Sequence, residues 1–197
     1  MKRFTDQEFL NLTLSMFNIE REITDGSLET RLVAQFKPLA YRECCMFADW
    51  SFLIKTETYE ESDSVDDEYD GHKYGFTLPE DFLKARLIND NYNEAFSVKG
   101  NCIYVDYPTL KLDYYSYDYT NAPVEFDQLA CYRCAIDISQ LLDPNGTALS
   151  TAQSLHQIVL TTLSNRDVNM TRKKTAEFDL DDTVFKVPTR EDKWLIN

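Results

Sequence analysis

Residues 73–90 read KYGFTLPEDFLKARLIND, and this stretch decides how the middle of the chain folds. Tyr74, Phe76 and Leu78 recur at every second position, which is typical of a strand with one buried face. Pro79 has no backbone N–H to donate and so ends that strand, and a second apolar run follows the acidic turn. The pattern predicts two strands joined by a tight link, with a helix through the second run as the competing interpretation.

Before this stretch, apolar residues recur at helical spacing and predict three helical pieces. A second helical piece is predicted over 28–36, and Pro38 fits the first position of a third, because a proline inside a helix costs about 3 kcal/mol. The buried face of that third helix is predicted to hold Ala40, Cys44 and Phe47. The first helix is predicted to begin after a Thr5 cap and to end before Asp25-Gly26-Ser27, with one apolar stripe made of Phe9, Leu12, Met16, Ile19 and Ile23.

Further strands surround the opening stretch. Residues 51–60 alternate apolar or threonine positions with polar ones, which predicts a strand with one wet face. Residues 96–106 read FSVKGNCIYVD, a hairpin pattern in which Gly100-Asn101 supplies the turn at positive φ. The tyrosine-rich run over 110–119 predicts one more strand.

An acidic segment over 60–72 interrupts the predicted sheet. Its like charges predict a solvated loop that repels itself and bulges from the sheet. A calcium loop is the sharper alternative, but the twelfth position of that loop would be Thr77 instead of the required glutamate. The acids of the segment are Glu60, Glu61, Asp63, Asp66, Asp67, Glu68 and Asp70.

Helical periodicity returns after the strands. One stripe precedes the stop signal at residues 143–146 and holds Phe126, Ala130, Cys134, Ile138 and Leu141. Thr147 is the predicted cap of the next helix, whose stripe holds Ala148, Ala152, Leu155, Val159 and Leu163. The chain is therefore predicted to be an α+β protein, in which a helical bundle over 1–50 and 124–170 packs with an inserted antiparallel sheet over 51–120.

Residues 171–197 are predicted to form an extended C-terminal arm, because the helical period fades near Met170. A frayed tail is the simpler interpretation of a polar terminal segment. Single apolar residues scattered along a polar segment are also typical of an arm that orders on a partner. The candidate anchors of that arm are Phe178, Phe185, Trp194, Leu195 and Ile196.

The charge of the chain limits its partners. The formal net charge is −14, and such a chain repels the phosphate backbone of DNA instead of gripping it. The first twenty residues lack an uninterrupted apolar core, so no signal peptide is expected, and no run is long enough to span a membrane.

Side chains that carry chemistry are few in the sequence. The five cysteines are expected to be free, buried thiols, with the Cys131–Cys134 CxxC inside a helix. A zinc site that adds Cys44 and Cys45 is the alternative, although adjacent cysteines give poor ligand geometry. His72 is expected in a solvated loop and His156 on a helix surface. Without phosphate-binding or nucleophile motifs, we expect no enzyme activity, cofactor or metal.

Several segments of the chain resemble one protein family when they are taken together. They read PLAYRECCMFADWSFLIK, YGFTLPEDFLKARLI, FSVKGNCIYVDY, LKLDYYSY and FDQLACYRCAIDIS. In this order they are similar to the head-to-tail adaptors of short-tailed bacteriophages, the tail tubular protein A group. The resemblance covers about residues 28–143, and its scaffold motif falls on Trp50, Phe52, Leu78, Pro79, Asp81 and Gly100.

The resemblance implies a structural role in the virion. Family members form a ring, twelve-fold in the family, that joins the capsid portal to the tail nozzle or the next ring protein. The resemblance also implies that DNA passes through the ring without specific binding, and that subunits are made in the bacterial cytoplasm before joining the head–tail junction. The helices would form walls between subunits, and the helical end with the C-terminal arm would contact the portal.

The composition of the chain also allows a different class of function. A small acidic protein can mimic DNA and inhibit a basic host enzyme, provided that its acids line one exposed face. Here one loop is densely acidic and the remaining acids are mixed with bases. That distribution favours the adaptor hypothesis.

Overall fold

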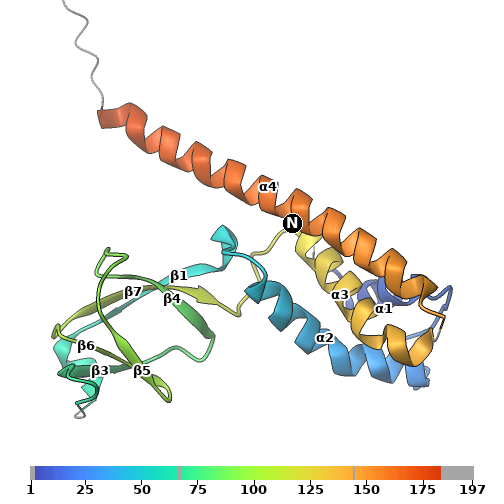
Figure 1. Ribbon diagram of the computed structural model, residues 1–197, viewed down its shortest axis with the longest axis horizontal. Helices are drawn as coiled ribbons and strands as arrows, with labels where there is room; N and C mark the ends of the chain where they lie inside the picture. The colour runs from blue at the N-terminus through green and yellow to red at the C-terminus, as the bar shows by residue number, and fades with distance from the viewer. Residues whose placement is uncertain (1–2, 66–67, 144, 183–197) are drawn as a thin grey trace, which may run out of the picture.

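The computed structural model describes residues 3–65, 68–143 and 145–182 (Figure 1). The fold is α+β, as the sequence predicted, with two N-terminal helices, antiparallel sheets and two C-terminal helices. A helical bundle forms one end of the molecule and the strands form the other. The helices are α1 (Asp6–Ser15), α2 (Leu28–Met46), α3 (Val124–Leu142) and α4 (Thr147–Asp182).

Helix α1 begins as the sequence predicted and ends earlier. The Thr5 side chain accepts the N–H of Glu8, and the Glu8 carboxylate accepts the N–H of Thr5, which makes a reciprocal capping box. The helix stops at Ser15, so the predicted long stripe is wrong: Ile23 lies beyond the helix and is 44% exposed. Its buried residues are Phe9, Leu10, Thr13 and Leu14.

Helix α2 corrects the prediction of two separate helices around Pro38. It runs without a break from Leu28 to Met46 with Pro38 inside it, on an exposed position. The buried residues before and after the proline, Val33 and Ala40, lie in one hydrophobic core, and that shared packing offsets the lost hydrogen bond. Phe47, predicted to be buried, follows the helix and is 42% exposed.

Within the described residues, seven strands form two sheets, where the sequence predicted one. The three-stranded sheet has the order β1-β7-β4, and the four-stranded sheet has the order β2-β3-β6-β5. Neighbouring strands pair antiparallel in both sheets. Short 3-10 turns precede β1 and β2, at Ser51–Leu53 and Glu61–Asp63. The strands are β1 (Ile54–Tyr59), β2 (Ser64–Val65), β3 (Tyr74–Thr77), β4 (Phe82–Ile88), β5 (Ser97–Lys99), β6 (Cys102–Val105) and β7 (Leu110–Ser116).

The opening stretch carries the chain from one sheet to the other. Strand β3 belongs to the four-stranded sheet and β4 to the three-stranded sheet, so the competing helical interpretation is wrong. The two ends of the link are fixed to different sheets. The N–H of Leu78 donates to the carbonyl of Asn101 at 2.9 Å, and the carbonyl of Asp81 accepts the N–H of Tyr117 at 2.7 Å.

The Asp81 carboxylate is the polar centre of this link. It accepts hydrogen bonds from Lys55 Nζ at 2.7 Å, Ser116 Oγ at 2.7 Å and the Tyr114 hydroxyl at 3.0 Å. Burial acts to raise the pKa of Asp81, but the three hydrogen bonds together outweigh it and lower the pKa. Lys55 also contacts Asp118 at 2.8 Å, so one ammonium joins the turn to the end of β7.

Strand β7 supplies side chains to two separate cores. Leu110, Leu112 and Tyr114 belong to the core between the two sheets, together with Phe76 and Leu78. Tyr115, the next residue, belongs to the helical core. Because adjacent residues of a strand point to opposite faces, β7 contacts the second sheet through Leu110, Leu112 and Tyr114 and reaches the helical core through Tyr115, near its C-terminal end.

Helix α3 lies at the centre of the bundle and α4 packs on it, and most residues of their predicted stripes are buried or half-buried. Leu141 is the exception, at 59% exposed. The turn after α3 is confirmed, but its cap differs from the prediction. The Asp143 carboxylate accepts the N–H of Ala148 at 2.6 Å, and Thr147 is the first residue of α4 instead of its cap.

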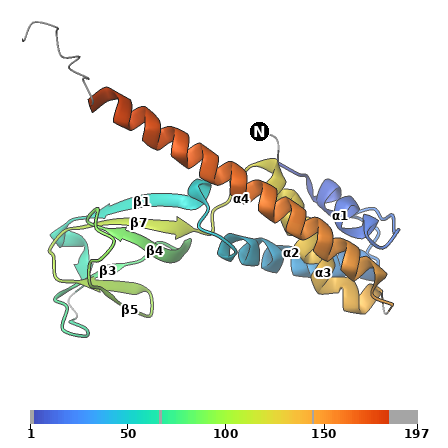
Figure 2. The same cartoon turned by 45° about the horizontal axis from the view of Figure 1, so that its top comes forward.

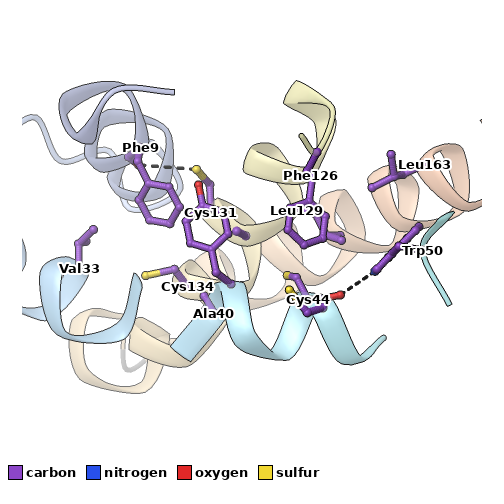
Figure 3. Packing of buried hydrophobic residues seen from close by; sticks show 14 of the residues in the cluster. Phe9, Val33, Ala40, Cys44, Trp50, Phe126, Leu129, Cys131, Cys134 and Leu163 are labelled. Atoms are coloured by element: carbon purple, nitrogen blue, oxygen red, sulfur yellow. Dashed lines mark hydrogen bonds between the residues drawn. The ribbon is translucent and has the colours of Figure 1, made fainter. Parts of the chain in front are cut away.

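The helical core is apolar and tightly interlocked (Figure 3). Trp50 is 1% exposed, and its indole N–H donates to the Cys44 carbonyl at 2.8 Å. Its ring lies 5.5 Å from Phe52 and 6.2 Å from Phe126, between centroids. These contacts fix the point where α2 turns into the first sheet.

Replacing Asp81 by alanine should destabilise the fold. The change leaves the Tyr114 and Ser116 hydroxyls without their acceptor, and we expect a loss of about 1–3 kcal/mol in the free energy of unfolding, measured by urea denaturation. Glu80→Ala, at the exposed neighbouring position, is the matched control and should change stability by less than about 0.5 kcal/mol. Equal effects of the two substitutions would contradict the role given to Asp81.

The same carboxylate should make stability depend on pH. A carboxyl whose folded pKa is lowered contributes stability above its unfolded pKa, near 3.9, and that contribution is lost as the pH falls through the folded value. The difference in unfolding free energy between the wild type and Asp81→Asn should therefore shrink as the pH falls below about 4. A difference that stays constant from neutral pH to pH 2 would show that Asp81 does not titrate in this way.

Candidate assembly surface

Helix α4 extends past the bundle and is the most prominent surface feature of the molecule. Its first part packs on α3, and its C-terminal part continues beyond the bundle as a projecting helix (Figures 1 and 2). The helix has 36 residues, which corresponds to a length of about 54 Å. A projecting helix of this kind is suited to contact another molecule, because its ribbon extends away from the bundle of its own subunit.

Arg166 and Asp167 connect α4 to the body of the molecule. The Asp167 carboxylate accepts the N–H of Ser51 at 3.0 Å and the Ser51 hydroxyl at 2.5 Å. Arg166 pairs with Glu125 at the start of α3, at 2.5 Å. Asp167 thereby caps the 3-10 turn that leads into β1, and this joint sets the direction in which the helix leaves the body.

The predicted extended arm needs a correction over its first part. Residues 171–182 continue α4 as a helix, whereas the fading apolar period had predicted extended chain from residue 171. Helix continuation does not require an apolar stripe, and helix-forming residues such as Lys173, Lys174 and Ala176 occupy this part. Phe178 lies within α4, and the other candidate anchors, Phe185, Trp194, Leu195 and Ile196, lie outside the described residues.

The scaffold residues of the sequence motif gather at the junctions between layers. Trp50 and Phe52 lie where the bundle meets the sheets, and Leu78, 5% exposed, lies in the core between the sheets. Pro79 and Asp81 form the link between sheets. Gly100 adopts φ +62° in the β5–β6 hairpin, as the turn pattern predicted.

The acidic segment is exposed, as predicted, but it is not wholly a loop. Glu60, Glu61, Asp63, Glu68 and Asp70 are all exposed. Within the segment, a 3-10 turn at Glu61–Asp63 leads into the short strand β2, which pairs with β3, so backbone hydrogen bonds hold an acidic stretch on the sheet edge. Asp66 and Asp67 lie outside the described residues.

A buried ion pair near the N-terminus was not foreseen from sequence. Asp127 is 1% exposed and accepts from Arg3 Nε at 2.8 Å, from the N–H of Phe4 at 3.0 Å and from the Tyr41 hydroxyl at 2.6 Å. Tyr41 stacks on Tyr119 with 4.3 Å between ring centroids. The group holds the N-terminal segment on α3, and its donors already satisfy the carboxylate, which indicates a structural role.

The cysteines are free, and four of them are buried, as predicted. Cys131 and Cys134 lie inside α3, where Cys131 donates weakly to the Phe9 carbonyl (Figure 3). Burial raises the pKa of the Cys134 thiol to about 12 and that of Cys45 to about 11. Thiols with such pKa values are poor nucleophiles and poor metal ligands at neutral pH.

The two histidines are less exposed than the sequence predicted. His156 is 8% exposed and meets the ring of Phe47 edge-on, with 5.2 Å between centroids. Burial, with the nearby Arg133, lowers the pKa of His156. His72 lies 3.2 Å from an Asp106 oxygen through Nδ1. Among the described residues, no group of three or more histidine, cysteine or acidic side chains is arranged to hold a metal ion.

Comparison with known proteins adds no identification. The chain matches no protein-family model, and no curated protein sequence matches it significantly. Within residues that the structure describes, no helix is both long and apolar enough to cross a bilayer.

The burial of the thiols predicts their reactivity. A thiol reagent added to the native protein at pH 8 should modify Cys102, which is half-buried, far faster than the four buried cysteines. All five should react in denaturant, which serves as the control for total thiol. Rapid modification of Cys131 or Cys134 in the native state, located by peptide mass spectrometry, would contradict the buried-thiol assignment.

Proposed function

We propose that the chain is a structural virion protein, one subunit of a head-to-tail adaptor ring of a short-tailed bacteriophage. In this role the ring joins the capsid portal to the tail and leaves a channel for DNA passage. The observation that carries the proposal is the projection of α4 beyond the body of the subunit. The resemblance to adaptors implies a portal contact at the helical end and the C-terminal segment.

The architecture supports this proposal in two ways. A helical core and a core between two sheets, both of which receive side chains from β7, suit a subunit that must transmit contacts within a ring. The sequence continues after the projecting helix with residues that include Trp194, Leu195 and Ile196. Aromatic residues carry a large share of the binding energy at protein interfaces, and these residues are therefore the candidate anchors.

The charge of the chain is consistent with a DNA channel. A subunit of net charge −14 does not attract the phosphate backbone, and a lumen that attracted phosphates would slow the passage of the duplex. The exposed acids of the segment around β2 belong to the strand end of the molecule.

Removal of residues 183–197 should leave the fold intact and abolish binding to the portal. Because this change leaves all described elements in place, we expect an unchanged unfolding midpoint and loss of binding to a purified portal ring, measured by native mass spectrometry. Trp194→Ala with Leu195→Ala and Ile196→Ala is the finer variant and should weaken portal binding at least about tenfold. The matched control is Thr77→Ala, at an exposed position of β3.

Normal portal binding by the truncated protein would contradict the role of residues 183–197 in the portal contact and would leave the adaptor proposal in place. A full-length monomer that ignores portals and captures a basic DNA-binding enzyme would favour the acidic inhibitor that mimics DNA.

A further inference from the structure

Strand β5 forms an open edge of the four-stranded sheet. It pairs in register with β6, with Val98 opposite Ile103. On its other side no strand of the described residues pairs with it, because the order of the sheet is β2-β3-β6-β5. Backbone groups alternate in direction along a strand, so part of the N–H and C=O groups of β5 point toward this open side.

The face of β5 that is turned toward the other sheet is uncovered as well. Val98 and Ile103 are directly opposite each other, so their side chains share one face. Ile103 is fully buried in the core between the sheets, whereas Val98 is 46% exposed and Phe96, two residues earlier, is 42% exposed. Three described strands face the four-stranded sheet, and Tyr59 of β1 lies over Phe76 of β3, with 5.5 Å between ring centroids. The apolar face of the larger sheet therefore continues past the smaller sheet at β5.

Exposed aromatic side chains gather around this edge. Among the described residues, five aromatic side chains are exposed, and all but Phe47 belong to the strand half: Tyr69, Tyr92, Phe96 and Tyr107. The Tyr107 hydroxyl is hydrogen-bonded to Glu94, in the loop that leads into β5. Contiguous exposed apolar groups mark interaction sites, and aromatic residues are the commonest anchors of such sites.

The opposite face of β5 is closed by the chain itself. The Ser97 hydroxyl donates to Asp70 at 2.7 Å, and Lys99 Nζ lies 4.7 Å from the centre of the Tyr69 ring. A lysine that projects from an edge strand opposes pairing with another chain, but Lys99 is held against this ring. The pairing of β5 is also regular, whereas β4 has two register shifts. The edge of β5 therefore keeps the geometry that an added strand needs.

The charges beside the edge are mainly negative. Asp70 lies on the face opposite to Val98, through its bond to Ser97. Asp106, whose side chain is 58% exposed, follows β6 two residues after Tyr104, which pairs with Ser97. One face of the edge is thus apolar and the other acidic. Such a surface attracts a basic partner, and it repels a second copy of a chain whose net charge is −14.

We propose that the open edge of β5 binds an extended strand of another protein, whose side chains alternate between apolar and basic. The backbone of that strand would hydrogen-bond to β5, which is the usual mode of strand addition to a sheet edge. Its apolar side chains would pack on Phe96 and Val98, and its basic side chains would lie near Asp70 and Asp106. The inference goes beyond the adaptor proposal and does not rest on it, because that proposal assigns the portal contact to the helical end and the C-terminal segment.

A synthetic peptide tests the edge directly. The probe is a fluorescent peptide of about seven alternating valine and lysine residues, within the usual length of a strand. It should bind the full-length chain saturably in fluorescence anisotropy. The same residues grouped in two blocks cannot present apolar and basic side chains to opposite faces, and a valine–glutamate peptide meets like charges, so both should bind at least about tenfold more weakly. No saturable binding of the probe, or equal binding of either control peptide, would overturn the inference.

A lysine on the edge locates the site. Val98→Lys removes an apolar contact and adds a charge that repels the probe, so the affinity should fall at least about tenfold. Ser62→Lys adds the same charge at an exposed residue of the 3-10 turn before β2, on the opposite edge of the sheet, and should change the affinity less than about twofold. Equal effects of the two lysines would overturn the inference.

Hydrogen exchange of the wild type gives a readout that needs no variant. The valine–lysine probe should slow exchange over residues 96–99 and leave the β2 edge, Ser64–Val65, unchanged. Slower exchange at β2 without any change at β5 would place the probe on the wrong edge and contradict the assignment.

Two other occupants of the edge are distinguished by further measurements. Concentration-dependent dimers of the wild type in sedimentation velocity, abolished by Val98→Lys, would assign the edge to a second copy. A synthetic peptide of residues 183–197 that binds more tightly than the valine–lysine probe would assign it to the chain's own terminal segment. Either result would overturn the inference, and we expect a wild type without such dimers and weaker binding by the terminal peptide.

Discussion

The hydrogen bonds at Asp81 are the interaction on which the sheet half of the molecule depends. The link between β3 and β4 must take the chain from one sheet to the other within four residues. Its first residue, Leu78, is fixed to the β5–β6 hairpin, and its last, Asp81, is fixed to β1 and β7 through Lys55, Tyr114 and Ser116. One carboxylate thus determines how the two sheets meet, and so the shape of the core between them.

The helical half depends in turn on the sheet that Asp81 holds. Tyr115 of β7 enters the helical core, and Trp50 closes that core at the point where the chain leaves α2. Asp127 fastens the N-terminal segment to α3 and Tyr41 on the other side. The layers of the fold are therefore joined by a few buried polar groups, and apolar packing fills the space between them.

Local structure could be predicted from the sequence where one short-range signal decides it. The Thr5 capping box, the Gly100 turn and the alternation of β7 are of this kind, since a cap, a positive φ and a period of two act over a few residues. Pro38 was misjudged because packing over the whole of α2 outweighs a local cost. The division into two sheets was missed because alternation identifies a strand but not its partner.

The candidate surfaces were only partly predictable for a related reason. The arm was proposed from scattered apolar residues, but the helix that carries it continues past the end of its apolar stripe. The Asp167–Ser51 contact joins residues far apart in the sequence, and no local pattern indicates it. The hairpin pattern includes Phe96 and Val98, but their exposure depends on how many strands face them in the other sheet.

The Asp167–Ser51 contact sets the direction of the last turns of α4. From that contact to Asp182 the helix extends about 22 Å, at 1.5 Å per residue. A difference of about 10° in the direction of the helix at that contact corresponds to about 4 Å at its last residue. The Asp167–Ser51 contact therefore decides where the end of α4 lies relative to the body of the subunit.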